Sequence, residues 1–340
     1  TKMFGDKYVF DVMNIIENKD DENLKKCLKD YLDKIKHLKE VDEESYWWEV
    51  EKLIECNYSI CGVFTQPDKP SGRGNKLVMS PVKELACKHG IPVYQPEKIS
   101  RECVELLSEM APDACVTAAF GQFLSEALLA IPKYGTINVH ASLLPKHRGS
   151  APINWAIIGG DEKTGVTTMF TVRKMDAGDI LLKSERVIGN ETAGEMTDLL
   201  AQDGADLLLE TLEKIENGTC PREPQCEEEM TYEPMLTKET GRIDWNLSAD
   251  SVKRLIQGTS PWPGAYMTVG GQIIKVWNAD VCEGNAEPGT ILSKDAKKGL
   301  IIACGEKAIM INELQAQGGK RMDAKSYLLG HQIKEDKAEV

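Results

Sequence analysis

The sequence has 340 residues, of which 41% are hydrophobic and 28% are charged, and its formal net charge is −13. This length accommodates two ordinary domains, and the composition is typical of a soluble globular protein. No apolar run approaches the roughly 20 residues that span a bilayer, and no basic-then-apolar leader opens the chain, so we expect a cytoplasmic protein without membrane contact. The negative charge argues against a broadly basic nucleic-acid-binding surface, but it allows a local basic patch.

The ten cysteines stand at irregular spacings and form no C-x-x-C pair. That pattern favours reduced thiols in a cytosol over a disulfide framework or a zinc site. Cys56 and Cys61 are the closest pair, and we interpret both as packing thiols. The sequence therefore predicts neither a bound metal nor a cross-linked scaffold.

In chain order, the first element is an opening segment, residues 1–48, which has no catalytic pattern. The short apolar run at 8–12 predicts a strand. Residues 22–40 predict an amphipathic helix, because apolar side chains recur at three- and four-residue spacing with lysines and acids between them. We interpret the segment as a packing or interaction extension.

From about residue 50 the sequence alternates between helical and strand patterns. Helices are predicted at 50–56, 81–89 and 100–110, and strands at 59–65, 92–94, 113–119 and 135–140. Such alternation indicates a parallel sheet with helices on both faces. Ligands of these sheets bind beyond the carboxyl ends of the strands, and His140 stands at such an end.

The second half of the chain changes character. Residues 160–187 are strand-rich, residues 192–216 predict a helix, and the proline-rich, acidic stretch 217–238 indicates an extended linker. Beyond the linker, short apolar runs alternate with turns at 266–269, 272–277, 290–292, 300–303 and 308–311. This spacing predicts a small β-barrel.

The stretch 135–149 holds the most informative residues. Asn138 and His140 lie two apart in a predicted strand, so their side chains point to the same side of the sheet. An Asn amide can hydrogen-bond a carbonyl oxygen as it becomes an oxyanion, an effect worth on the order of 3 kcal/mol. A His can hold charge or carry a proton near neutral pH. The pair therefore suits acyl transfer.

A second polar turn follows at 175–179, where Asp176 and Asp179 flank small residues. An acid close to His140 would make the imidazole more basic and accept charge from an attacking amine. Each signal is weak alone, because a His on a strand is more often structural and an acidic turn with small residues is ordinary. The surrounding sequence must decide the interpretation.

Distinctive motifs run from about residue 50 to the end of the chain. The sharpest is NVHASLLPKHRG at 138–149, followed by SAPINWAI, GDEKTGVT and MDAGDIL. Others are TQPDKPSGRG, SPVK, FGQ, GRIDW, PWPG and GKRM. Together they resemble the methionyl-tRNA formyltransferase family, one of the folate-dependent formyltransferases, and matches this long and dispersed are specific.

The resemblance implies a Rossmann-like catalytic domain at 49–216 and a C-terminal, tRNA-binding, OB-like β-barrel at 239–340, with the linker between them. It implies that Asn138 and His140 polarise the formyl group, and that Asp176 supports His140 and proton transfer. The formyl donor would be 10-formyltetrahydrofolate, and no metal would be needed. The implied walls of the folate pocket are Phe120, Gly121, Gln122, Ser142, Leu143, Leu144 and Pro145.

The implied acceptor is the methionyl amine of initiator tRNA, for translation initiation, and we expect a monomer. Local charge bears on the RNA partner, because the Gly- and Pro-rich loop from Asp68 to Lys83 carries a net charge of +3. Such a loop could follow a phosphate backbone, and a solvated surface loop is the alternative. A second basic cluster, which includes Lys325, is also ambiguous by itself. The candidate tRNA-binding residues are Lys69, Arg73, Lys76, Lys83, Lys320 and Arg321.

The opening of the chain departs from the family, which begins with a strand and a G-T-P-x-F-A turn ahead of the helix at 50–56. Residues 43–48 read EESYWW and supply neither. One alternative is that the strand at 8–12 replaces the missing one, with 13–45 as an insertion. The other is that the first 48 or so residues are foreign to the family. Because the first strand of such a sheet is usually central, its loss would leave neighbouring strands unpaired and weaken the folate site.

Two other functions share parts of this pattern. A different folate-dependent enzyme, which formylates an amino-sugar nucleotide or hydrolyses formyl-folate, would use the same Asn, His and Asp. The basic loop at 68–83 and the tail ending near Leu329 favour tRNA over these substrates. A catalytically impaired tRNA-binding homologue is the alternative from another class, and the intact trio argues against it.

Overall fold

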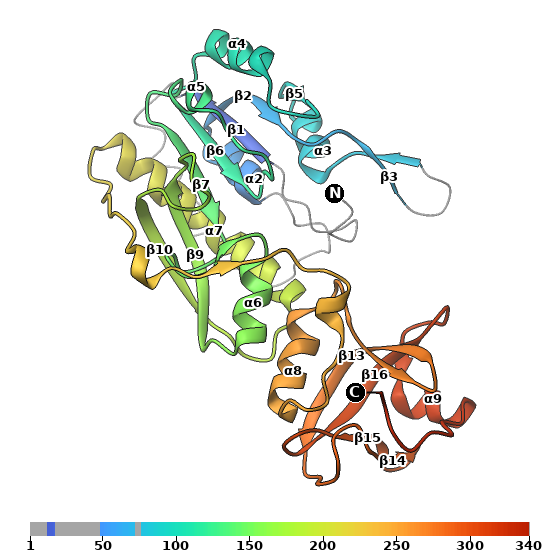
Figure 1. Ribbon diagram of the computed structural model, residues 1–340. Coiled ribbons are helices and arrows are strands. Elements are labelled where there is room, and N and C mark those ends of the chain that lie inside the picture. The colour runs from blue at the N-terminus through green and yellow to red at the C-terminus, as the bar shows by residue number, and fades with distance from the viewer. Residues whose placement is uncertain (1–11, 18–47, 72–75, 340) are drawn as a thin grey trace.

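The structure is a computed structural model that describes residues 12–17, 48–71 and 76–339. Figure 1 shows an α/β part built on one large sheet and a C-terminal part built on antiparallel strands. In the described ranges, no helix has both the length and the apolar character to cross a membrane. The predicted helix at 22–40 lies outside the described residues.

A seven-stranded sheet in the order β10-β9-β7-β6-β1-β2-β5 forms the first part. Pairing is parallel between β2 and β5 and between β6 and β7, and β1 is antiparallel to both β2 and β6. The carboxyl ends of β5, β2, β6 and β7 therefore lie along one edge, which confirms the predicted Rossmann-like fold. The strands are β1 (Val12–Glu17), β2 (Ser59–Phe64), β5 (Val93–Tyr94), β6 (Ala114–Ala118), β7 (Thr136–His140), β9 (Lys163–Phe170) and β10 (Ile180–Val187).

Strand β1 occupies the centre of this sheet and runs against its neighbours. Its first residue, Val12, pairs with Ala118 at the end of β6, and Met13 pairs with Phe64 at the end of β2. Of the strand predicted at 8–12, only Val12 lies within the described residues. Strand β1, from the opening segment of the chain, hydrogen-bonds to both β2 and β6, so these neighbouring strands have ladder partners.

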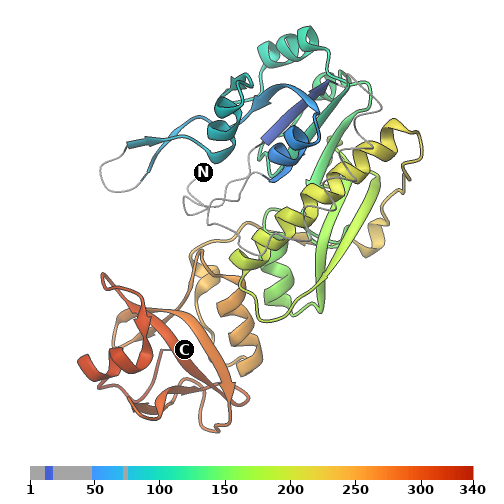
Figure 2. The same ribbon diagram turned by 180° about the vertical axis from the view of Figure 1, so that it is seen from behind.

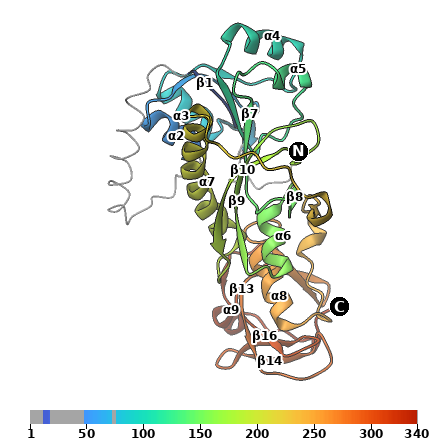
Figure 3. The same cartoon turned by 90° about the vertical axis from the view of Figure 1, so that its left-hand side faces the viewer.

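Helices cover both faces of the sheet, because successive strand residues point to opposite sides. In β6, Val116 packs in a core with α2 and α7, whereas its neighbour Cys115 packs with α4 and α5. Figure 3 shows α7 and α5 on opposite sides of the sheet. The helices of the α/β part are α2 (Trp48–Glu55), α3 (Pro81–Lys88), α4 (Arg101–Met110), α5 (Glu126–Leu129), α6 (Pro152–Gly159) and α7 (Ala193–Glu216).

Helix α7 lies across the strands that lead to the predicted site, as Figure 2 shows from behind. A capping box starts it: Thr192 Oγ1 accepts a hydrogen bond from Glu195 N, and the Glu195 carboxylate accepts one from Thr192 N. Leu208 and Leu212 on its apolar side join the core with Ile137 of β7. Helix α7 therefore packs against one face of β7 and holds the strand in place.

The C-terminal part is an antiparallel sheet in the order β12-β13-β16-β15-β14, with β17 paired to β16. Its core centres on the fully buried Trp245, from the GRIDW motif. This architecture agrees with the predicted barrel-like domain. Its elements are α8 (Ala249–Gly258), β12 (Ala265–Val269), β13 (Gln272–Cys282), β14 (Ile291–Asp295), β15 (Gly299–Ala303), β16 (Ala308–Ala316), β17 (Met322–Asp323) and α9 (Ala324–Gly330).

The two parts meet where α6 packs on α8. A Cβ on Gly258 would come within 2.5 Å of Ile158 Cγ1, so glycine permits the close approach of the helices. Asn154 Nδ2 donates to Gly258 O at 2.7 Å across the same contact. Neither α6 nor α8 was predicted from the sequence, although α8 has its buried residues, Val252, Leu255 and Ile256, at helical spacing.

The segment 68–83, predicted to be a loop, contains two short strands and the start of a helix among its described residues. Strands β3 (Lys69–Ser71) and β4 (Lys76–Val78) form an antiparallel hairpin, and Ser80 caps α3 by accepting a hydrogen bond from Lys83 N at 3.3 Å. Short strands also occur in two places without a predicted element, at β8 (Arg148–Gly149) and at β11 (Tyr232–Glu233) in the linker. These two pair in parallel, so the linker crosses the α/β part (Figure 1).

Candidate active site

Strand β7 presents two polar side chains at the edge where the parallel strands end. Asn138 pairs with Thr117 of β6 and with Met169 of β9, and His140 pairs with Thr167 of β9. Because Asn138 and His140 are two apart in the strand, they lie on the same face, as predicted. His140 is the last residue of β7 and is buried, with 7% of its side chain exposed.

The Asn138 amide is oriented by its neighbour on β6. Thr117 Oγ1 donates to Asn138 Oδ1 at 2.8 Å, and Thr117 is itself buried. Because the amide oxygen is engaged, the group that Asn138 can offer to a ligand is its Nδ2 donor. A fixed donor of this kind stabilises negative charge on a carbonyl oxygen.

His140 is held in one tautomer by the turn that follows β7. Its Nε2 lies 2.9 Å from the carbonyl oxygen of His147, which can only accept, so Nε2 carries a proton. In the neutral ring, Nδ1 is then the nitrogen that can accept a proton. Nδ1 faces Asp176 Oδ1 at 3.7 Å, and Asp176 has 14% of its side chain exposed. The three predicted catalytic residues thus come from two segments brought to one edge of the sheet.

Asp176 sits in a tight turn between β9 and β10. Its φ is +50°, an uncommon conformation for a residue with a side chain, and its Oδ2 accepts a hydrogen bond from Gly149 N at 2.9 Å. Two residues later, a Cβ on Gly178 would come within 1.7 Å of Phe170 O, so only glycine fits there. The turn is therefore built to hold the carboxylate in one place.

His147 anchors the turn that orients His140, a role that the sequence did not reveal. Its Nδ1 lies 2.8 Å from Glu233 Oε1, and its Nε2 lies 2.8 Å from Asp161 Oδ2. The residue has a φ of +56° and only 13% of its side chain is exposed. A short-range signal was present in the HRG triplet, but the two acids come from distant segments, and their positions could not be inferred from spacing.

The candidate folate residues fall into two groups. Gly121 is exposed and Gln122 is half-buried, and both follow the end of β6 beside the site. Gln122 Oε1 accepts a hydrogen bond from Ile99 N at 2.9 Å, and Phe120 is buried in the core that holds α4 and α5. Of this group, Gly121 and Gln122 are thus the members with surface open to a ligand.

The second group lies in the turn after His140. Ser142 and Leu144 are fully buried, and Ser142 Oγ donates to Lys146 O at 2.8 Å. Thr167 Oγ1 donates to Ser142 O at 2.6 Å and accepts from Leu144 N at 3.2 Å. Leu143 and Pro145 are half-buried. Ser142 and Leu144 therefore shape the turn from inside, and Leu143 and Pro145 carry the exposed surface.

The candidate tRNA residues are dispersed along the chain, and several are engaged within the protein. Lys83 Nζ donates to Asp68 Oδ2 at 2.6 Å and to Gln95 Oε1 at 2.7 Å. Arg321 pairs with Glu313 at 2.5 Å and lies over the Trp277 ring, whereas Lys320 is exposed. The structure describes only the backbone of two others, Lys69 and Lys76. Arg73 lies outside the described residues.

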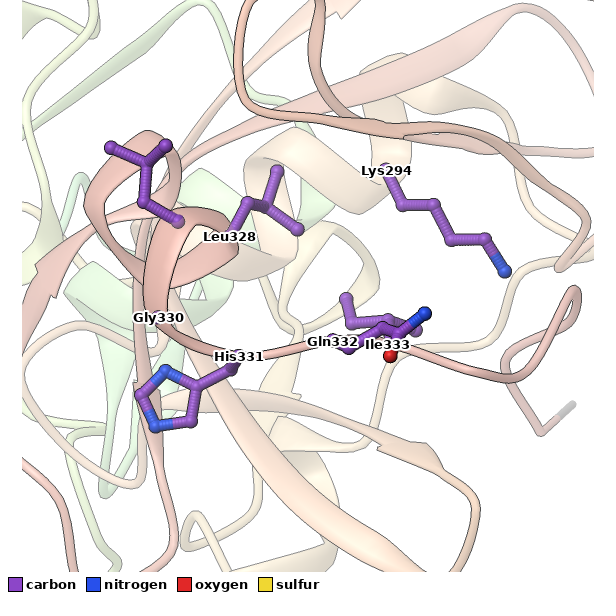
Figure 4. A pocket seen from close by; sticks show the side chains of 7 residues that line it. Lys294, Leu328, Gly330, His331, Gln332 and Ile333 are labelled. Carbon is purple, nitrogen blue, oxygen red and sulfur yellow. The ribbon is translucent and has the colours of Figure 1, made fainter.

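A surface hollow of about 350 Å³ lies in the C-terminal part, away from the polar residues of β7. Figure 4 shows its lining, Lys294 and residues 328–333, with the His331 ring directed away from Lys294. Lys294 Nζ donates to Glu335 O at 3.0 Å and pairs with Asp336 at 2.8 Å, and the His331 ring stacks on Tyr327. The side chains that line this hollow do not form a catalytic arrangement.

No group of three or more His, Cys, Asp or Glu side chains is arranged to hold a metal ion in the described ranges. The polar residues of β7 and the Asp176 turn instead combine a fixed amide donor, an imidazole with a defined proton acceptor, and a carboxylate beside it. Together with the sheet topology, these features are those of a Rossmann-like enzyme of the group-transfer class, and they make the carboxyl edge of the sheet the candidate site.

Comparison with known proteins defines the family. Residues 50–212 match the formyl transferase family, and residues 235–332 match the formyl transferase C-terminal domain. A methionyl-tRNA formyltransferase of Acetivibrio thermocellus is 50% identical over 291 residues, covering 84% of this chain and 93% of that protein. One from Caldanaerobacter subterraneus is 47% identical over 291 residues, covering 84% and 94%. The chain therefore belongs to the formyl transferase family, as its motifs predicted.

A solved structure shares the fold at lower sequence identity. HypX from Aquifex aeolicus, in complex with tetrahydrofolic acid, has a TM-score of 0.54 and 20% identity, and the match covers 73% of this chain. The chain spans only 44% of that protein. The likeness supports the fold over the matched part of the chain.

Proposed function

We propose that the chain transfers the formyl group of 10-formyltetrahydrofolate to the amino group of methionyl initiator tRNA. The observation that carries the proposal is the convergence of Asn138, His140 and Asp176 at the carboxyl edge of the sheet. The curated relatives with 47–50% identity are called methionyl-tRNA formyltransferases, and this chain covers more than nine tenths of each of the two named above.

The reaction follows from the orientation of the three side chains. The neutral amine nitrogen attacks the formyl carbon, and Asn138 Nδ2 donates to the formyl oxygen as negative charge develops on it. His140 Nδ1 accepts the proton that the amine loses, and the Asp176 carboxylate stabilises the resulting imidazolium. The bond between the formyl carbon and the folate nitrogen then breaks, and that nitrogen takes the proton from His140. Tetrahydrofolate and the formylated amine are released.

Under the same proposal, the folate binds to the partly exposed surface beside Asn138, His140 and Asp176. Gly121, Gln122, Leu143 and Pro145 would contact the folate directly, and Phe120, Ser142 and Leu144 would support them from within. A reactive carbonyl bound here would meet donors whose orientation is already fixed, so little reorganisation would precede the reaction.

The tRNA would contact the hairpin β3–β4 and the C-terminal domain. The proposed residues are Lys69, Arg73, Lys76, Lys83, Lys320 and Arg321. Because Lys83 is paired with Asp68 and Gln95, contact with a phosphate would require it to exchange those partners. We further propose a catalytic domain at 49–216 and a tRNA-binding domain at 239–340, in a monomeric, cytoplasmic protein.

The test is an acceptor comparison. Purified protein with 10-formyltetrahydrofolate would be given charged initiator Met-tRNA or, separately, a nucleotide-linked amino sugar, and formylated product would be measured by mass spectrometry. We expect formyl-methionyl-tRNA in the first reaction and no product in the second. Formylation of the sugar alone would replace the proposal with a sugar formyltransferase, and release of formate alone would indicate a hydrolase.

A further inference from the structure

Gln225, in the linker, is bonded to both turns that make the site. Its Nε2 donates to Asp176 O at 2.9 Å and to Gly178 O at 2.7 Å. Its Oε1 accepts from Arg148 Nε at 3.0 Å and from Arg148 Nη2 at 2.8 Å. One amide therefore satisfies four hydrogen-bonding groups, two on each turn.

Arg148 is an unusual partner because its side chain is almost completely buried, with 2% exposed. Its remaining nitrogen, Nη1, donates to Glu227 Oε1 at 3.0 Å, and Glu227 also pairs with Lys174. Hydrogen bonds from Lys174 and then Arg148 hold the pKa of Glu227 below its usual range. A buried guanidinium needs such partners, because an unpaired charge in this place would be strongly destabilising.

These contacts lead directly to the catalytic groups. Arg148 stands between His147, whose carbonyl oxygen accepts from His140 Nε2, and Gly149, whose N–H donates to Asp176 Oδ2. The backbone of Asp176 is bonded to Gln225. The position of His140 and the position of Asp176 thus both depend on segments that Gln225 joins.

We propose that Gln225 is a positioning residue that fixes the distance between the Asp176 carboxylate and His140 Nδ1. The inference rests on the proposed formyl transfer. Asp176 has a positive φ and is not hydrogen-bonded to His140, so the outer contacts of its turn set the 3.7 Å separation. A misplacement of about 1 Å in such a constellation can lower a rate by about 100-fold.

A simpler role would be that Gln225 only tethers the linker, and a single substitution separates the two roles. In Gln225→Glu, the carboxylate still accepts from Arg148, so the tether persists, but the two donor bonds to the Asp176 turn are lost. In Gln225→Met, a side chain of similar length loses donor and acceptor together. If Gln225 only tethers the linker, kcat should fall in Gln225→Met alone. If Gln225 positions the Asp176 turn, kcat should fall in both variants.

The experiment measures kcat and KM for formyl transfer to charged initiator Met-tRNA, with thermal unfolding of each variant. We expect kcat to fall at least tenfold in both variants, with KM for the folate and for the tRNA within twofold of the unaltered chain. The matched control is Thr237→Ala, in the same linker, which removes an exposed hydroxyl contact with Thr240 at 3.3 Å, away from the Asp176 turn, and should keep kcat.

The outcomes separate the two proposals. If the unaltered chain transfers no formyl group, the proposed function is overturned and this inference with it. If the unaltered chain is active and folded Gln225→Glu retains its kcat, the positioning role alone is overturned. A rise of KM at constant kcat would also overturn it. If Gln225→Glu does not unfold cooperatively, folded Gln225→Met provides the test instead, and an unchanged kcat in that variant would overturn the positioning role.

Discussion

The carboxyl edge of the large sheet has two groups of polar side chains, one beyond β2 and β5 and one at the end of β7, and the two groups differ in their hydrogen-bond partners. Beyond β2 and β5, Asp68, Lys83 and Gln95 bond to one another at 2.6 to 2.8 Å. At the end of β7, His140 and Asp176 face each other at 3.7 Å, and each is held instead by backbone groups of the turns around them. Polar side chains that hydrogen-bond to one another support the fold. Side chains that are positioned by backbone groups keep other polar atoms available to bind a substrate.

A large loss of activity is expected from Asn138→Ala, in the half of the edge that holds the candidate site. Removal of the amide donor should lower kcat by about 100- to 1,000-fold, because the developing oxyanion loses its fixed partner. Thermal unfolding should change little, since Asn138 is half-buried and its hydrogen-bond donor, Thr117, has a second acceptor in Ile137 O.

The counterpart in the other half is Gln95→Ala, which removes bonds to Gln66 O, Asp68 and Lys83. It should lower the melting temperature and leave kcat within severalfold. If Gln95→Ala lowered kcat as much as Asn138→Ala, the distinction between a supporting cluster and a catalytic one would be lost.

The next prediction is a loss of stability on substitution in β1, the strand that lies between β6 and β2. Asn14→Pro removes a backbone N–H from a strand that is paired on both sides, and we expect at least about 2 kcal/mol of lost stability. Asn14→Ala, which keeps the N–H, is the matched control. Urea unfolding checks the pair, and equal stabilities of the two variants would contradict the central place of β1.

The elements of the fold that could be predicted are those marked by a local pattern of apolar residues in the sequence. Strands β2 and β6 and helix α7 were predicted within one or two residues, because apolar runs and helical spacing mark them directly. Strand β1 was not predicted at 12–17, since a six-residue strand gains its stability from two neighbours that lie far along the chain. Its direction could not be inferred at all, because no local pattern distinguishes a parallel strand from an antiparallel one.

The predictable part of the site is similarly limited. The family motifs predicted Asn138, His140 and Asp176, and the structure brings them to one edge. The partners that orient them were not found, because Glu233, Asp161 and Gln225 belong to segments without a catalytic pattern. The acidic linker in particular was interpreted as an extended connection, and its hydrogen bonds to the site depend on tertiary structure alone.

Gly149→Ala tests how closely the linker approaches the catalytic turn. Gly149 has a φ of +111°, and a Cβ there would come within 2.4 Å of Glu233 O. We expect a loss of about 1 to 3 kcal/mol in unfolding free energy, with reduced activity, because the Gly149 N–H also holds Asp176. Gly218→Ala has a positive φ but no atom within 4 Å of the added Cβ, so it should cost less. Equal costs in urea unfolding would show that Glu233 moves aside freely.

The smallest effect is a pH dependence in the supporting half. Hydrogen bonds from Lys83 and then Gln95 lower the pKa of Asp68, so its stabilising contribution is present above the unfolded value of 3.8 and is lost as pH falls through the lower folded value. Asp68→Asn should therefore destabilise the protein at pH 7 by at most about 1 kcal/mol, since the pair is partly exposed. The difference between the two proteins should shrink below about pH 4. Urea unfolding at pH 7, 5, 4 and 3 measures it, and a difference that is constant with pH would contradict the assignment.

The central claim is that His140 carries the proton in formyl transfer, and a single-turnover measurement with His140→Ala tests it most directly. Enzyme in excess over charged initiator Met-tRNA and saturated with 10-formyltetrahydrofolate would report the chemical step without product release. We expect the rate to fall by about 100- to 10,000-fold in a variant that keeps its melting transition. A folded His140→Ala protein with a near-normal rate would contradict the account.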